Sequence, residues 1–144
     1  MAVTLVPTVG ASNANSYASV GEATVELEGH PDVADWTALS ADEQARALIL
    51  ATERVDQEEY EGSPVNPLAG TSDGTVQALK FPRNGCTSDE GWTYRNDIIP
   101  VPIKKGTIAL ALEIGAGGVS LTDEGLEGFE AVAQWLENFG KETL

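Results

Sequence analysis

The sequence predicts a mainly α-helical fold, a small helical bundle with a short β-hairpin or extended segments and a C-terminal helical tail. Three observations predict this class. Ser-x-x-Glu capping boxes begin helical patterns at Ser19 and Ser40, an apolar helical pattern follows Pro102, and segments rich in glycine and proline separate these patterns. The 144 residues can bury one core, so we expect a helical domain at 1–118 and a tail at 119–144.

The N-terminal part of the chain is expected to lead into the first helix. Residues 2–9 alternate loosely between apolar and polar types, which suits a short edge strand or an extended arm. Ser19 can cap the helix, with Glu22 completing the box, and Gly29 and Pro31 end it. The chain starts with no basic, apolar secretion signal, and no apolar run approaches the roughly 18 to 20 residues that span a bilayer. We therefore expect a protein that is made and kept in a cytoplasm, or that lies inside an assembly built there.

The central helix is expected over residues 39–56. Ser40 and Glu43 form its capping box, and Trp36 is expected to pack onto its first turn rather than to bind a ligand. One apolar stripe is formed by Ala45, Leu48, Ile49, Thr52 and Val55. The acidic residues 56–61 lack the ligand spacing and the central glycine of a calcium loop, so we expect a solvated helix end there.

The middle of the chain carries turn and hairpin signals. A long irregular segment is expected at residues 61–75, where glycine and proline recur. After it, Pro82 holds Phe81 in an extended conformation and places Arg83 beside it. Residues 89–91 are typical of a hairpin tip.

This tip is expected to lead into a strand that presents Trp92 and Tyr94 on one face. Arg83 and Arg95 are two of only eight cations in the chain. We expect both to pair with acidic neighbours and not with a phosphate.

A third helix is expected after Pro102, which suits a first helical turn. One stripe is formed by Ile103, Gly106, Leu110 and Ile114, and the other sides carry Ile108, Ala111 and Leu112. A helix this apolar is either a core element or a contact between subunits. The glycine-rich residues 115–118 are expected to end it in a flexible joint.

Residues 121–139 show a further helical pattern beyond that joint. Thr122 is its cap, its polar face is acidic, and its stripe is formed by Leu126, Phe129, Ala133 and Leu136. Two interpretations stay open. The helix either folds back onto its own domain or places its stripe in a groove on another protein.

Charge limits the classes of partner. Eight basic and 23 acidic residues give a formal net charge of −15. Such a surface repels phosphate, because Lys and Arg supply the affinity for nucleic-acid backbones. The charge therefore either keeps the protein soluble or allows DNA to pass without binding.

No residue pattern specifies an active site or a metal site. Cys86 is the only cysteine and His30 the only histidine, and we interpret them as a loop thiol and a surface imidazole. The carboxylates lack the spacing of an acid/base pair. Residues 115–118 follow a helix instead of beginning one, unlike a phosphate-binding loop. We expect no enzyme, no cofactor and no metal.

Three sequence blocks together carry a resemblance to a known family. They are Ala-Asn-Ser-Tyr-Ala-Ser at 14–19 with Glu22 and Ala23, then Trp-Thr-Ala-Leu-Ser at 36–40 with Glu43, Gln44 and Ala-Leu-Ile-Leu-Ala-Thr at 47–52, then Leu-Lys-Phe-Pro-Arg at 79–83 with Ile99, Pro100, Ile103 and Lys104. Over residues 14–114 their order resembles tailed-phage proteins labelled DnaT-like single-stranded DNA-binding proteins. The stretch after Gly118 lies outside the resemblance.

That family in turn resembles the head-to-tail connector adaptors of long-tailed phages. This resemblance implies a structural virion protein of the phage neck, assembled in the host cytoplasm as a homo-oligomeric ring, usually a dodecamer. The ring would lie below the portal and extend the DNA channel toward the stopper and tail. Expected partners are other copies of the chain, the portal protein, a stopper or tail protein, and double-stranded DNA that passes without specific binding.

Two residue sets are assigned to these contacts. Portal binding is assigned to the tail residues Leu126, Phe129, Val132, Trp135, Leu136 and Phe139. Contacts between subunits are assigned to Ile108, Leu112, Phe81, Arg83, Trp92 and Tyr94.

The alternative function is that of a single-stranded DNA-binding protein in a phage replication system. Such proteins combine a basic groove with exposed aromatic side chains. Because cations are scarce and Trp92 and Tyr94 alone make a small platform, we expect no salt-sensitive binding of an oligonucleotide at micromolar protein.

Overall fold

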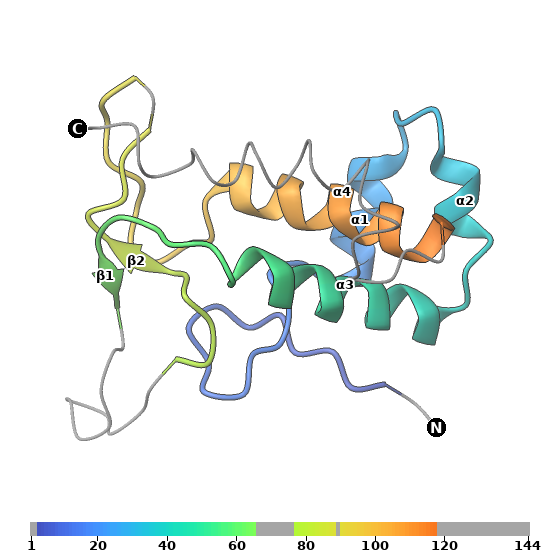
Figure 1. Cartoon of the computed structure of the whole chain (residues 1–144), viewed down its shortest axis with the longest axis horizontal. Helices are drawn as coiled ribbons and strands as arrows, with labels where there is room; N and C mark the ends of the chain where they lie inside the picture. The colour runs from blue at the N-terminus through green and yellow to red at the C-terminus, as the bar shows by residue number, and fades with distance from the viewer. Residues whose placement is uncertain (1–2, 66–76, 89, 118–144) are drawn as a thin grey trace.

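The computed structural model describes residues 3–65, 77–88 and 90–117. The elements are α1 (Val20–Leu27), α2 (Val33–Thr37), α3 (Ala41–Val55), β1 (Ser63–Pro64), β2 (Arg83–Asn84) and α4 (Val101–Gly117). β1 and β2 form a two-stranded antiparallel sheet (Figure 1). The predicted class, a mainly helical fold with a small β-hairpin, is confirmed. Within the described ranges, no helix has the length and apolar character needed to cross a membrane.

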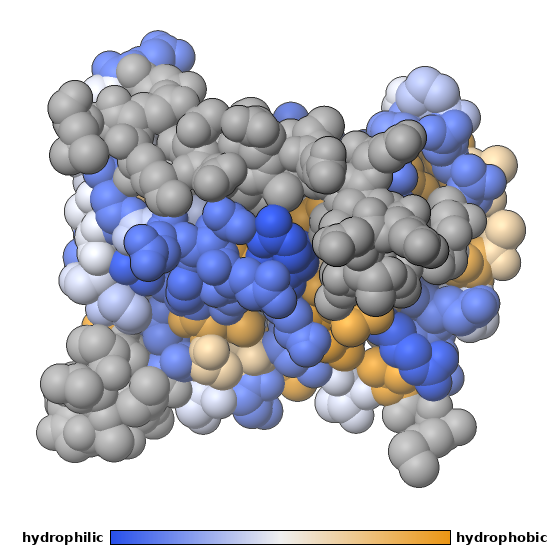
Figure 2. All heavy atoms as spheres, viewed as in Figure 1, coloured by the Kyte–Doolittle hydropathy of each residue, from blue (hydrophilic) through white to orange (hydrophobic). Residues whose placement is uncertain are grey.

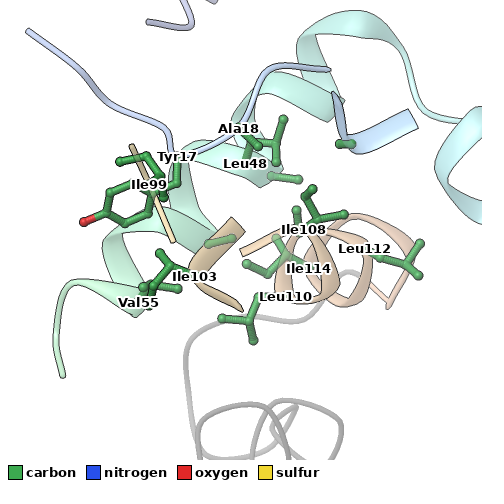
Figure 3. Packing of buried hydrophobic residues seen from close by; sticks show 14 of the residues in the cluster. Tyr17, Ala18, Leu48, Val55, Ile99, Ile103, Ile108, Leu110, Leu112 and Ile114 are labelled. Atoms are coloured by element: carbon green, nitrogen blue, oxygen red, sulfur yellow. The ribbon is translucent and has the colours of Figure 1, made fainter. Parts of the chain in front are cut away.

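The centre of the molecule is the antiparallel pair α3 and α4, which lie side by side (Figure 1). Both helices contribute buried aliphatic side chains, and the segment before α1 covers one side of them. Figure 3 shows this packing around Leu48 and Val55 of α3, Ile103 and Ile108 of α4, and Tyr17 and Ala18 of the preceding segment. The strands lie at the end of the molecule where α3 ends and α4 begins (Figure 1).

Both predicted capping boxes are confirmed. The Ser19 hydroxyl accepts a hydrogen bond from the Glu22 N–H at 3.0 Å, and the Ser40 hydroxyl accepts one from the Glu43 N–H at 3.2 Å. Each satisfies a donor that a helix start leaves open. These local bonds fix where α1 and α3 begin.

Trp36 is a packing residue, as predicted. It lies in α2, a short helix that the sequence pattern did not predict, and it is fully buried. Its indole N–H donates to the Thr24 hydroxyl at 3.1 Å. Trp36 therefore joins α2 to α1.

Helix α4 is mostly apolar, as predicted, and its inward residues belong to the core. The prediction that residues 115–118 end it in a joint is wrong in part, because α4 continues to Gly117. At Gly115 a β-carbon would lie 2.5 Å from the Leu39 Cδ1 atom. The glycine is therefore a close-packing position, at which α4 approaches the segment before α3.

The N-terminal segment is an extended arm and not an edge strand over the described residues 3–9. The Val6 N–H donates to the Asn15 side chain at 2.7 Å, and the Val3 N–H donates to Asp42 of α3 at 3.2 Å. The Asn15 N–H also donates to the Val6 carbonyl at 2.9 Å, so side-chain and backbone bonds together hold the arm over these described residues, without a neighbouring strand.

The prediction of a solvated helix end at residues 56–61 is wrong for its first and last residues. Asp56 accepts hydrogen bonds from the Tyr17 hydroxyl and, at 3.2 Å, from the Lys80 N–H. Glu61 accepts from both the N–H and the hydroxyl of Thr87, each at 2.6 Å. These carboxylates attach the end of α3 to the 77–88 segment.

Several predictions fall outside the described residues. They are the greater part of the irregular segment at 61–75, the tail at 119–144 with its helical pattern, and all six residues assigned to portal binding. The division into a domain at 1–118 and a tail stays a prediction.

Candidate functional site

An exposed aromatic pair lies on a tight turn near the strands. The Ser88 N–H donates to the Trp92 carbonyl at 2.8 Å, and the Tyr94 N–H donates to the Cys86 carbonyl at 2.8 Å. Between these bonds Thr87 and Thr93 form an antiparallel bridge. This arrangement agrees with the predicted hairpin.

The two rings contact each other. Trp92 and Tyr94 have ring centroids 4.7 Å apart at 65°, an edge-to-face arrangement typical of aromatic pairs. Tyr94 is half-buried, whereas Trp92 is 54% exposed. The Trp92 indole therefore contacts Tyr94 and is exposed to solvent. This agrees with the prediction that the two aromatic side chains lie on one face.

Arg95 follows directly and pairs with an acidic neighbour, as predicted. Its guanidinium donates to the two carboxylate oxygens of Asp97 at 2.9 and 2.6 Å. The hydrogen bond from Arg95 lowers the pKa of Asp97. Because both side chains are well exposed, 72% and 59%, the pair lies in water and adds little to stability.

The prediction for Arg83 is wrong in its partners. Its guanidinium donates to backbone carbonyls, including Glu61 at 2.9 Å and Gly62 at 2.8 Å. It also lies over the Phe81 ring, 6.0 Å from the centroid. Five N–H groups in a fixed fork suit several carbonyls at once, so Arg83 supports the chain around β1.

Most other cations in the described ranges also bind the chain itself. Arg54 pairs with Glu58 at 2.7 Å, and the Lys80 ammonium donates to the Glu58 carbonyl. Lys104 pairs with Glu22 at 2.5 Å. These three cations are therefore engaged within the chain itself.

The residues assigned to subunit contacts occupy different environments. Phe81, Ile108 and Leu112 are buried in the core of the single chain. Arg83 and Tyr94 are half-buried, and Trp92 is exposed. Only the aromatic pair is brought together at the surface, and the assignment to subunit contacts stays a prediction.

The lone cysteine and histidine lie in contrasting settings. Cys86 is buried, and burial raises its pKa to about 11, which disfavours the reactive thiolate. His30 is exposed, and its Nδ1 accepts a hydrogen bond from the Asp32 N–H at 3.1 Å. Within the described ranges, no group of three or more His, Cys, Asp and Glu residues could hold a metal ion.

Two features of the structure could not be predicted from the sequence. The first is the set of backbone carbonyls around Arg83, which leaves no signal in residue types. The second is an open groove between α1 and α4, which includes the exposed Val25 and Val101. The exposure of two valines on separate helices becomes visible only once both helices are placed.

Comparison with known proteins gives one family. A family model described as "Putative DnaT-like ssDNA binding protein" matches residues 1–132. Neither the curated proteins nor the solved structures contain a match.

Proposed function

Because this chain belongs to the family described as "Putative DnaT-like ssDNA binding protein", we propose that it binds single-stranded DNA by stacking bases on Trp92. The observation that carries the proposal is the exposed indole, which is supported from the side by Tyr94 at 4.7 Å. Arg95, the residue after Tyr94, adds a planar cation to the same segment of the chain.

The family corrects the main function expected from the sequence. A structural neck adaptor, with portal and tail partners and with DNA passing unbound, is contradicted by a family described as binding single-stranded DNA. The alternative function is the one that the family supports. The resemblance to the DnaT-like family was correct, whereas its extension to connector adaptors has no support.

The turn makes Trp92 suitable for stacking. Its backbone carbonyl is held by the Ser88 N–H at 2.8 Å, and the next bond of the turn, from Tyr94 to Cys86, has the same length. A ring held in place loses little conformational freedom when a base stacks on it. Stacking on an aromatic side chain contributes about 1 to 3 kcal/mol per base for any base type.

Electrostatics limits the affinity. A net charge of −15 repels the phosphate backbone, so stacking has to supply most of the binding energy. Two stacked bases at about 1 to 3 kcal/mol each correspond to a Kd of about 40 µM at the tightest. We therefore expect a Kd of about 40 µM or weaker. We also propose that this function involves no catalysis.

The test is fluorescence anisotropy of a labelled oligothymidine, with protein titrated well above 100 µM. Trp92→Ala is expected to weaken binding at least about 5-fold, because each base that stacks on the indole loses about 1 to 3 kcal/mol. Trp92→Phe should keep most of the affinity, because a ring remains.

Ile98→Ala is the matched control, since Ile98 is an exposed apolar residue of the same region of the chain that lacks a ring. It should bind like the unaltered protein. An equal affinity for Trp92→Ala and the unaltered chain would contradict stacking on Trp92. Absence of binding by the unaltered chain would contradict the function itself.

A further inference from the structure

An open groove of about 570 Å³ lies between α1 and α4. Val25 of α1 and Val101 of α4 line it and are 66% and 56% exposed. They are the most exposed large hydrophobic side chains in the described ranges. Two aliphatic side chains from different helices that face one groove are typical of a docking surface for an apolar partner.

One wall of this groove carries cations. Lys104 and Lys105 of α4 line it and are the only two adjacent basic residues in a chain with eight cations and 23 acidic residues, whereas Glu22 and Glu26 line the α1 side. Lys104 pairs with Glu22 at 2.5 Å, and Lys105 is exposed. A partner that presents an apolar stripe, with a row of carboxylates along the edge that faces α4, would complement both the valines and the lysines.

Residues 121–139 of the same chain have this pattern. Their apolar stripe contains Leu126, Phe129, Ala133 and Leu136. Asp123, Glu130 and Glu137 recur every seven residues, and in a helix this spacing puts them in one row along the edge of that stripe. The segment lies outside the described residues, so its pattern is known from sequence alone.

Chain length allows this segment to reach the groove. Lys104 and Lys105 lie about 18 to 20 Å back along the axis of α4 from its end at Gly117. A helix over residues 121–139 would be about 28 Å long, and a connection of about three residues suits an antiparallel helix pair. In that arrangement the two lysines lie level with about residue 133, between Glu130 and Glu137.

We propose that residues 121–139 form an amphipathic helix that docks in the α1/α4 groove of its own chain. Its stripe covers Val25 and Val101, and its carboxylate row faces Lys104 and Lys105. This inference is independent of single-stranded DNA binding and chooses between the two interpretations that the sequence left open for the tail.

Hydrogen exchange of the full chain, followed by mass spectrometry, tests the docking. Amides of residues 121–139 should exchange at least about tenfold more slowly than in an unstructured peptide. Val25→Glu combined with Val101→Glu should remove that protection. Leu50→Glu is the control, because it adds a charge at a 38% exposed apolar residue of α3, outside the groove, and should leave the protection unchanged.

Two further measurements make the result specific. Lys105→Glu should reduce the protection, and adding Glu130→Lys should restore it by exchanging the charges. The protection should also be the same over a hundredfold range of protein concentration. Concentration-dependent protection would assign the groove to a second copy and overturn the proposal, as would an unprotected tail or protection that survives the double valine variant.

Discussion

A single hydroxyl group at Tyr17 joins three segments of the chain. It donates to Asp56 at the end of α3 and accepts a hydrogen bond from the Phe81 N–H at 3.1 Å, while the Tyr17 N–H donates to the Thr52 hydroxyl at 3.2 Å. Burial raises the pKa of Tyr17 well above its usual value and also raises the pKa of Asp56. The hydroxyl therefore stays protonated, and ionised Asp56 depends on it as a donor.

The pH dependence of stability follows from this contact. Because the folded-state pKa of Asp56 is raised, its contribution to stability is largest at low pH and is lost as pH rises through that pKa. The Tyr17 hydrogen bond opposes this loss, since it favours the carboxylate. Tyr17→Phe should therefore reduce the free energy of unfolding by about 1 to 3 kcal/mol, and more at pH 7 than at pH 3.5. Urea unfolding at both pH values measures the difference.

Tyr60→Phe provides the comparison. The Tyr60 hydroxyl donates to the Val55 carbonyl at 2.8 Å, an acceptor that does not titrate. Its loss should reduce stability by a similar amount at both pH values. If both variants show the same pH dependence, Asp56 does not depend on Tyr17 in the way described.

At the scale of elements, the tight approach of β1 and β2 depends on Gly62. Its φ is +81°, and a β-carbon there would lie 1.9 Å from the Asn84 carbonyl oxygen. Gly91 also has a positive φ, +92°, but nothing lies within 4 Å of its β-carbon position. Comparing the two glycines therefore distinguishes the cost of a positive φ from the cost of a steric clash.

Alanine substitutions at the two positions should therefore reduce stability by different amounts. Gly91→Ala should cost about 1 to 2 kcal/mol of stability, from the positive φ alone. Gly62→Ala should cost about 2 to 5 kcal/mol, because the clash adds to the strain. Chemical denaturation of both variants measures the costs, and equal values would show that the strand can move away from residue 62.

Elements specified by local bonds could be predicted, whereas those specified by distant contacts could not. The starts of α1 and α3 follow from Ser-Glu pairs three residues apart, and the structure contains both bonds. β1 and β2 are two residues each and pair across about twenty intervening positions, a length too short for an alternating pattern to appear. Because it is a glycine, Gly115 was expected to end the helix. It lies within α4 instead, where it packs closely against Leu39.

The same limit applies to the candidate site. The aromatic pair could be predicted, since alternation places Trp92 and Tyr94 on one face. The partners of Arg83 could not, because it binds carbonyl groups that every residue carries. Charge was the least informative property for function. A net charge of −15 disfavours phosphate binding, but it does not exclude a stacking site.

At the scale of the whole molecule, the acidic surface determines how binding should respond to salt. Figure 2 shows hydrophilic residues over much of the described surface on one face, with apolar residues in smaller patches between them. A protein that grips phosphates loses affinity as salt rises, with a slope of about −0.7 in log K per phosphate contact on a single strand. A protein that repels the strand at long range gains affinity, because salt screens the repulsion.

The dependence of oligothymidine binding on salt is therefore the final prediction. Between 50 and 300 mM salt, log K should stay level or rise, since Arg95, which directly follows the aromatic pair in the sequence, is paired with Asp97. Asp97→Asn removes that carboxylate, so it should tighten binding and make the slope more negative by up to about 0.7. Glu59→Gln is the control for total charge, because this exposed carboxylate lies outside the turn; it should change the slope less. A slope of about −3 or steeper for the unaltered chain would require several phosphate contacts and would contradict binding by stacking alone.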